Sequence, residues 1–291
     1  PDLCPVADGG EGTAEALGLA HGGGAAGAGG HDPLGRPVQA GFVLVEDGGT
    51  AIVEVAAASG LGLVAEAERD AEAASTYGTG EVIASAIDAG AQVVLVAVGG
   101  SGTTDGGVGA IEAIAERGGL RGASLVLLCD VRTPFEEAAE VFGPQKGADP
   151  AAVERLTARL HAVAETWPRD PRGQTMTGAA GGLSGGLWAA LGAKLEPGAP
   201  FVLDALGFDL RMREAGAVIV GEGRMDATTL EGKIAGEIAV RARQAGVPCH
   251  AACGQNALSP FDQRILDIQR IVEATTLSEL ESAGEHLAAH L

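Results

Sequence analysis

Residues 92–107 read QVVLVAVGGSGTTDGG, and here an apolar run passes directly into a segment dominated by glycine. The apolar part is short, continuous and rich in valine, which is typical of a strand buried on both faces of a sheet. The second part holds five glycines and only small polar side chains, those of Ser101, Thr103, Thr104 and Asp105. A helical pattern follows at 107–119. The order of strand, glycine loop and helix predicts an α/β protein, in which ligands bind beyond the carboxyl ends of the strands.

Two other stretches have the same construction, VADGGEGT at 6–13 and VGEGRMDATTLEGK at 220–233. Glycines let backbone N–H groups approach an anion closely, and the N-terminus of the following helix adds partial positive charge. The alternative is an ordinary turn between strand and helix, in which glycine, threonine and aspartate serve only the turn. Because all three loops also carry an acid, we expect them to line one shared site.

Strand and helix alternate through much of the chain, which predicts α/β layers with a largely parallel sheet. Residues 41–56 interrupt the alternation, because two β-rich runs flank Asp47-Gly48-Gly49 as in a β-hairpin. This hairpin indicates a mixed sheet in a second domain. We expect helices at 12–23, 79–91, 107–119, 150–167, 186–192, 232–246 and 277–291, and further strands at 123–131, 215–223, 247–256 and 268–275.

Composition excludes several classes of protein. Acidic residues outnumber basic ones by 39 to 19, and a formal charge of −20 repels nucleic-acid phosphates. The four cysteines are scattered through a long chain, which suits a reducing cytosol better than a disulfide framework. No apolar stretch reaches the roughly 18 residues of a membrane span, and the first residues do not resemble a signal peptide. We therefore expect a cytoplasmic protein that binds neither nucleic acid nor membrane.

The known phosphate motifs are absent. Gly232-Lys233 lacks the upstream glycine of a P-loop, and GEGRMD ends in Asp226 where a dinucleotide fingerprint needs glycine. GLSGG at 182–186 has the letters of a nucleophile elbow, but no strand precedes it. Histidine is missing from all three glycine loops, so the candidates for chemistry are carboxylates, lysines and arginines.

The third loop has the most complete chemistry. Arg224 and Lys233 can neutralise a phosphate or a carboxylate, while Glu222 and Asp226 can hold Mg²⁺ or accept a hydroxyl proton. The alternative is that Asp226 and Lys233 are surface charges at the start of a helix. Lys146, in the turn VFGPQKGADP at 141–150, lies either in a cleft or on a surface turn.

Five motifs in this order resemble the type I glycerate kinases: VADGGEGT, GGSGTTDGG, CDV with VFGPQKGA, GAAGGLSGG and GEGRMDATTLEGK. The resemblance implies ATP-dependent phosphorylation of the small molecule D-glycerate with Mg²⁺, with 2-phosphoglycerate favoured over 3-phosphoglycerate. It implies a discontinuous Rossmann- or flavodoxin-like domain over 1–32 and 214–291, with a second α/β domain inserted at 33–213 and a cleft between them. It also allows a homodimer.

The resemblance assigns expected roles to the loop residues. The expected catalytic residues are Asp8, Asp105, Arg224, Asp226 and Lys233, with Asp105 and Asp226 also candidate Mg²⁺ ligands. The expected phosphate- or substrate-binding residues are Gly9, Gly10, Glu11, Thr13, Gly99, Gly100, Ser101, Gly102, Thr104, Gly106, Gly107, Lys146, Gly221, Glu222 and Gly223.

Family members begin with a further strand and helix that carry a P-D-S-[FY]-K motif upstream of the residues matching VADGGEGT. This chain starts at Pro1 without that unit, so we expect either a fragment or a shortened homologue. Two other functions are open. One is an anion- or nucleotide-binding homologue without catalysis, and the other is a nicotinamide-dependent oxidoreductase, which the missing G-x-G-x-x-G motif disfavours.

Overall fold

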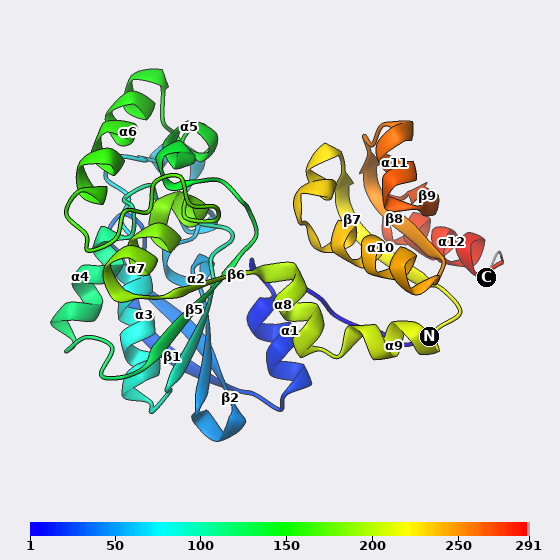
Figure 1. The fold of residues 1–291 in the computed structure, drawn as a ribbon, viewed down its shortest axis with the longest axis horizontal. Helices are drawn as coiled ribbons and strands as arrows, with labels where there is room; N and C mark the ends of the chain where they lie inside the picture. The colour runs from blue at the N-terminus through cyan, green and yellow to red at the C-terminus, as the bar shows by residue number, and fades with distance from the viewer. Residues whose placement is uncertain (290–291) are drawn as a thin grey trace. The chain divides into compact units, whose positions relative to one another are not determined.

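The computed structural model describes residues 1–289, which form two compact units (Figure 1). The large unit comprises Val6–Val202, and the small unit comprises Pro1–Pro5 together with Leu203–Leu291. Each unit has its own β-sheet. The predicted α/β class with one mixed sheet and one parallel sheet is confirmed.

The large unit is built on one six-stranded sheet, ordered from β1 to β6 as in the sequence. Strands β1 to β3 form an antiparallel meander, and β3 to β6 run parallel. The predicted hairpin is the β2–β3 pair, with Asp47 at a positive φ of 54° in its turn. The strands are β1 (Gly24–His31), β2 (Pro37–Val45), β3 (Thr50–Glu54), β4 (Val93–Ala97), β5 (Ser124–Cys129) and β6 (Lys194–Pro197).

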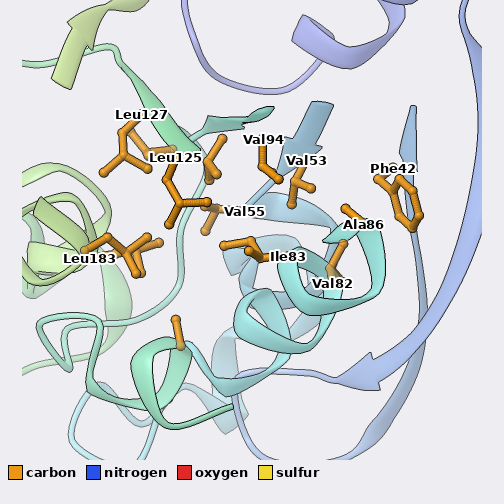
Figure 2. Packing of buried hydrophobic residues seen from close by; sticks show 14 of the residues in the cluster. Phe42, Val53, Val55, Val82, Ile83, Ala86, Val94, Leu125, Leu127 and Leu183 are labelled. Carbon is orange, nitrogen blue, oxygen red and sulfur yellow. The ribbon is translucent and has the colours of Figure 1, made fainter. Parts of the chain in front are cut away.

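Helices pack on both faces of this sheet. Val43 of β2 lies against Gly18 of α1 on one face, and Figure 2 shows Val82 and Ile83 of α3 against Val53 and Val94 on the other. Helix α6 begins where Asp149 accepts a hydrogen bond from the Ala152 amide at 2.7 Å. The α-helices are α1 (Thr13–Ala20), α2 (Ala56–Ser59), α3 (Tyr77–Asp88), α4 (Val108–Glu116), α5 (Ala138–Phe142), α6 (Pro150–Ala164), α7 (Leu183–Leu191) and α8 (Gly198–Ala205), which crosses the unit boundary.

The small unit has a parallel three-stranded sheet of β7 (Val218–Met225), β8 (Cys249–Asn256) and β9 (Ile268–Glu273). The first residues of the chain are tied to this unit by Arg211, which binds both carboxylate oxygens of Asp2 at 2.6 and 2.7 Å. Cys249 and Cys253 on β8 are buried free thiols. The helices are α9 (Phe208–Glu214), α10 (Ile234–Ala245), α11 (Pro260–Leu266) and α12 (Leu277–Ala288).

This division differs from the predicted one at both boundaries. The large unit begins at Val6, so 6–32 belongs to it and not to the discontinuous domain as predicted. Within this segment, strand β1 pairs with β2 along its whole length. Its sequence GAAGAGGH carries no side-chain alternation that would predict a strand. At the other boundary, Arg241 of α10 binds Asp204 and Asp209, so 203–213 packs with the small unit.

Within residues 1–289, no helix combines the length and the apolar character that crossing a membrane requires.

Candidate active site

Two of the three glycine loops meet at the carboxyl ends of the parallel strands in the large unit. The Gly99 amide, just after β4, donates a hydrogen bond to the Gly9 carbonyl at 3.0 Å. A Cβ atom on Gly99 would lie 2.6 Å from the Cα of Gly10, so only glycine permits this approach. Asp130, the residue after β5, lies beside them, with Oδ2 at 3.1 Å from the same Cβ position. The expected convergence of these two loops is therefore present in the structure.

Gly9 makes this convergence possible, because its φ is +99° and a Cβ atom would lie 2.5 Å from the Leu128 carbonyl oxygen. We expect Gly9→Ala to lower the free energy of unfolding by about 2 kcal/mol or more, because both the backbone conformation and the contact become strained. Chemical denaturation measures this change. Gly62→Ala is the matched control, since a Cβ atom there meets nothing within 4 Å. An equal, small effect at both positions would contradict the prediction.

The loop at 98–107 and Asp130 border a pocket of about 70 Å³. Polar side chains and the glycine backbone line one part of the pocket, and apolar side chains line the rest. The first set is Gly99, Gly100, Ser101, Asp130, Gln145 and Lys146, and the second is Val98, Val131, Phe142 and Ala180. A pocket that offers both groups suits a small ligand with polar and hydrocarbon faces.

Lys146 supplies the pocket with a buried cation. Its side chain is only 2% exposed, and Nζ donates a hydrogen bond to the Thr103 carbonyl at 2.5 Å. The Phe142 ring centroid lies 5.9 Å from Nζ. Burial lowers the pKa of Lys146 to about 7, although the charges of Asp105 and Asp130 act in the opposite direction. Of the two positions left open from the sequence, the structure places Lys146 in the pocket.

Asp130 supplies a carboxylate in the same pocket, and it is absent from the residues expected from the sequence. Burial, assisted by the nearby charge of Asp8, raises the pKa of Asp130 to about 6, and Lys146 opposes the shift. A carboxyl group tuned toward neutrality in a pocket is a candidate for proton transfer. The signal for it in the sequence is its place directly after a buried apolar strand, which the glycine loops share.

Other predicted residues of these loops have identifiable tasks. Ser101 lines the pocket, and its Oγ lies 3.0 Å from the Thr103 Oγ1. Glu11 lies against Gly100, where a Cβ atom would be 2.9 Å from Oε1. Thr13 closes its own loop by donating to the Gly10 carbonyl at 2.7 Å. Thr104 is fully buried, and its Oγ1 has no hydrogen-bond partner among the described residues.

Asp105 has a different task from the expected catalytic and metal-binding one. Its carboxylate accepts hydrogen bonds from the amide and hydroxyl of Thr76, at 2.8 and 2.9 Å, and from the Gly107 amide at 3.0 Å. Gly109 and Ser75 approach the same carboxylate at 3.3 and 3.4 Å. These donors occupy the carboxylate oxygens, so Asp105 ties its loop to the starts of α3 and α4.

Several predicted amide donors are likewise used inside the protein. Gly102 donates to the Ser59 carbonyl at 2.8 Å, and Gly106 donates to the Gly181 carbonyl at 3.1 Å. Together with Gly99 and Gly107, these amides hold the loop in place. The expectation that they bind phosphate does not agree with these bonds, because each amide N–H has one hydrogen to donate.

The third predicted loop forms a local cluster in the small unit. Asp226 caps a short 3-10 helix at Ala227–Glu231 by accepting from the amide and hydroxyl of Thr228, and Arg224 Nε donates to it at 3.0 Å. The Thr228 hydrogen bonds are the main reason that the pKa of Asp226 lies below its usual value. Lys233 stands at the N-cap of α10.

The glycines of this third segment do not form the expected turn. Gly221, Glu222, Gly223 and Arg224 lie within β7 instead. Gly221 pairs with Ala252, Glu222 with Cys253 and Arg224 with Gln255. Parallel pairing with β8 extends the strand to Met225, two residues beyond the predicted end, which uses backbone groups that a ligand-binding turn would present.

Neither expected Mg²⁺ ligand fits a site built by the protein. Asp105 and Asp226 each accept hydrogen bonds from residues of the protein that surround them. Among residues 1–289, no group of three or more histidine, cysteine, aspartate or glutamate side chains is placed to hold a metal ion. The donor set therefore supports no step that passes through a metal held by these residues.

The fold and the pocket define an α/β protein with a small polar site at its strand ends, and comparison with known proteins identifies the family. The sequence model of the glycerate kinase family matches residues 1–118 and 115–291. The chain belongs to the glycerate kinase family, and it is a kinase.

Its relatives include bacterial glycerate kinases. The glycerate kinase of Bacillus subtilis (strain 168) is 36% identical, over 99% of this chain and 85% of the relative. The glycerate 2-kinase of Escherichia coli (strain K12) is 37% identical, over 79% of this chain and 70% of the relative. A crystal structure of a glycerate kinase 2 from Salmonella typhimurium LT2 matches with a TM-score of 0.77 and 33% identity, over 97% of this chain and 84% of that one.

Proposed function

We propose that this protein transfers the γ-phosphoryl group of ATP to D-glycerate, and that the product is 2-phosphoglycerate. The relatives named glycerate kinase support the substrate, and the name of the Escherichia coli relative supports the position of phosphorylation. The observation that carries the proposal is the pocket in the large unit, where a buried ammonium and a partly buried carboxylate occur together.

These two groups match the chemistry of a hydroxy acid. The substrate carboxylate is an anion that pairs with the Lys146 ammonium, and a substrate hydroxyl donates its hydrogen to Asp130. Bound glycerate replaces the water beside Lys146 and Asp130, and its contacts with these two side chains also orient its hydroxyl. Asp8 strengthens the basicity of Asp130 by its own negative charge.

The transfer itself needs alignment and charge stabilisation more than covalent help. The hydroxyl oxygen forms a bond to the γ-phosphorus, the bond from that phosphorus to the bridging oxygen of ADP breaks, and the hydroxyl proton passes to Asp130. Arg224 and Lys233 remain predicted partners of the phosphates. Magnesium, a cytoplasmic location and a homodimer also stay predictions.

The test is a coupled ADP-release assay with ATP, Mg²⁺ and D-glycerate, followed by phosphorus NMR of the product. We expect ADP release that depends on glycerate, and a phosphorus signal split by one proton, as a phosphate on carbon 2 requires. A signal split by two protons would indicate 3-phosphoglycerate. Binding of glycerate or ATP in calorimetry without ADP release would favour the alternative, a non-catalytic binding homologue.

The dependence of kcat/KM on pH follows from the two tuned groups. Asp130, with a pKa near 6, must be deprotonated to accept a proton, so the rate falls below that pH. Lys146, with a pKa near 7, must be protonated to bind an anion, so the rate falls above that pH. We expect a narrow maximum of kcat/KM for glycerate between about pH 6 and 7, because kcat/KM reports the enzyme before glycerate binds.

Measurement from pH 5 to 9 at saturating ATP checks this profile. Lys146→Arg keeps its charge throughout this range and should lose the alkaline limb. A flat profile across the range, or an alkaline limb unchanged in Lys146→Arg, would contradict the assignment of these groups.

A further inference from the structure

Ala180, on the apolar side of the pocket, has a backbone conformation that favours glycine. Its φ is +52° and its ψ is +41°, and it starts a run of three left-handed residues with Gly181 and Gly182. For an L-residue with a Cβ atom this conformation costs about 1–2 kcal/mol. Glycine occupies the next two positions, while alanine is present only where the run borders the pocket.

The surrounding structure imposes this conformation. The Gly181 carbonyl accepts a hydrogen bond from the Gly106 amide at 3.1 Å, and the Gly182 amide donates to the Gly178 carbonyl at 3.1 Å. A Cβ atom on Gly181 would lie 1.9 Å from the Thr103 carbonyl oxygen, the same oxygen that Lys146 binds. The run therefore packs directly against the loop that forms the polar side of the pocket. A strained backbone persists where its neighbours determine it in this way.

Four residues form the apolar side of the pocket, and they are Val98, Val131, Phe142 and Ala180. Ala180 is only 8% exposed. Glycine at 180 would remove the strain and enlarge the pocket by one methyl group. The backbone conformation at 180 therefore does not need the methyl group of Ala180.

We propose that Ala180 is a specificity-determining residue, whose methyl group restricts the substrate to three-carbon hydroxy acids. This inference rests on the proposed function. The methyl group closes the space that an additional carbon on carbon 3 of glycerate would need. Lys146 and Asp130 hold the carboxylate and the hydroxyl, which glycerate shares with an acid that is one carbon longer.

The experiment compares D-glycerate with 2,3-dihydroxybutanoate, which is glycerate with one added methyl group. For each enzyme the ratio of the two kcat/KM values is measured. Wild type should prefer glycerate, and Ala180→Gly should reduce that preference by about 10-fold or more, in line with the effect of one methylene in an apolar pocket. Ala180→Ser, which adds one atom at the same position, should lower kcat/KM for glycerate itself.

Asp47→Gly is the matched control, because it relieves a positive φ of 54° at an exposed turn away from the pocket. The ratio of its kcat/KM values for the two acids should equal that of wild type. If wild type phosphorylates glycerate and Ala180→Gly keeps the wild-type ratio, the methyl group serves only core packing and the inference fails. If Ala180→Gly does not fold, an unchanged kcat/KM in Ala180→Ser overturns it. Absence of glycerate phosphorylation in wild type would instead remove the proposed function, and this inference with it.

Discussion

Replacing Lys146 by methionine is expected to lower kcat/KM for D-glycerate by about 10²- to 10³-fold, the usual effect of removing one buried donor to a charged group. Methionine fills a similar volume, so the packing around Phe142 and the 101–107 loop is kept. The substrate carboxylate then meets no cation in the pocket. The Thr103 carbonyl also loses its hydrogen bond from Nζ, which lowers the free energy of unfolding by about 1–3 kcal/mol. The variant no longer buries a charge, and this gain offsets the loss.

Steady-state kinetics and a thermal melt, run on the same preparation, separate these two effects. Lys194→Met is the matched control, because Lys194 is exposed at the start of β6 and the chain has only three lysines. The control should keep wild-type kinetics. A folded Lys146→Met enzyme with kcat/KM within about threefold of wild type would exclude Lys146 from substrate binding.

Replacing Asp130 by asparagine is expected to lower kcat by about 10²- to 10⁴-fold, the range that a general base contributes. Asparagine has the same shape and still accepts a hydrogen bond, so KM for glycerate should change little. The proton of the attacking hydroxyl then has no acceptor of suitable basicity. Removing a carboxylate beside Asp8 also removes like-charge repulsion, so the fold should not be weakened.

Single-turnover and steady-state rates with saturating ATP and glycerate measure this loss. Asp170→Asn serves as the control, since Asp170 pairs with Arg172 on the surface of the same unit. A higher KM for glycerate with an unchanged kcat would show that Asp130 only binds substrate. Unchanged values of both would remove it from the mechanism.

Local patterns in the sequence were sufficient where one segment determines its own structure. The β2–β3 hairpin follows from β-rich runs around Asp47-Gly48-Gly49, and α6 follows from an apolar stripe with Pro150 at its first position. The glycine loops at 6–13 and 98–107 meet as expected. Only the second of them follows a strand, because residues 1–7 form neither helix nor strand. In contrast, β1 is composed almost entirely of glycine and alanine, and it becomes a strand only by pairing with β2.

The sequence by itself determined the α/β class, the family through the order of its motifs, and the loops that carry the site. Only the tertiary structure decided which polar groups of those loops face the pocket. Asp105 and Asp130 each follow an apolar run at a strand end. Asp105 is surrounded by amide and hydroxyl donors at the starts of α3 and α4. Asp130 lines a pocket together with Lys146. The difference arises because a carboxylate's role depends on the donors, charges and burial around it. Part of that environment comes from residues far away in the chain, such as Thr76 beside Asp105 and Asp8 near Asp130.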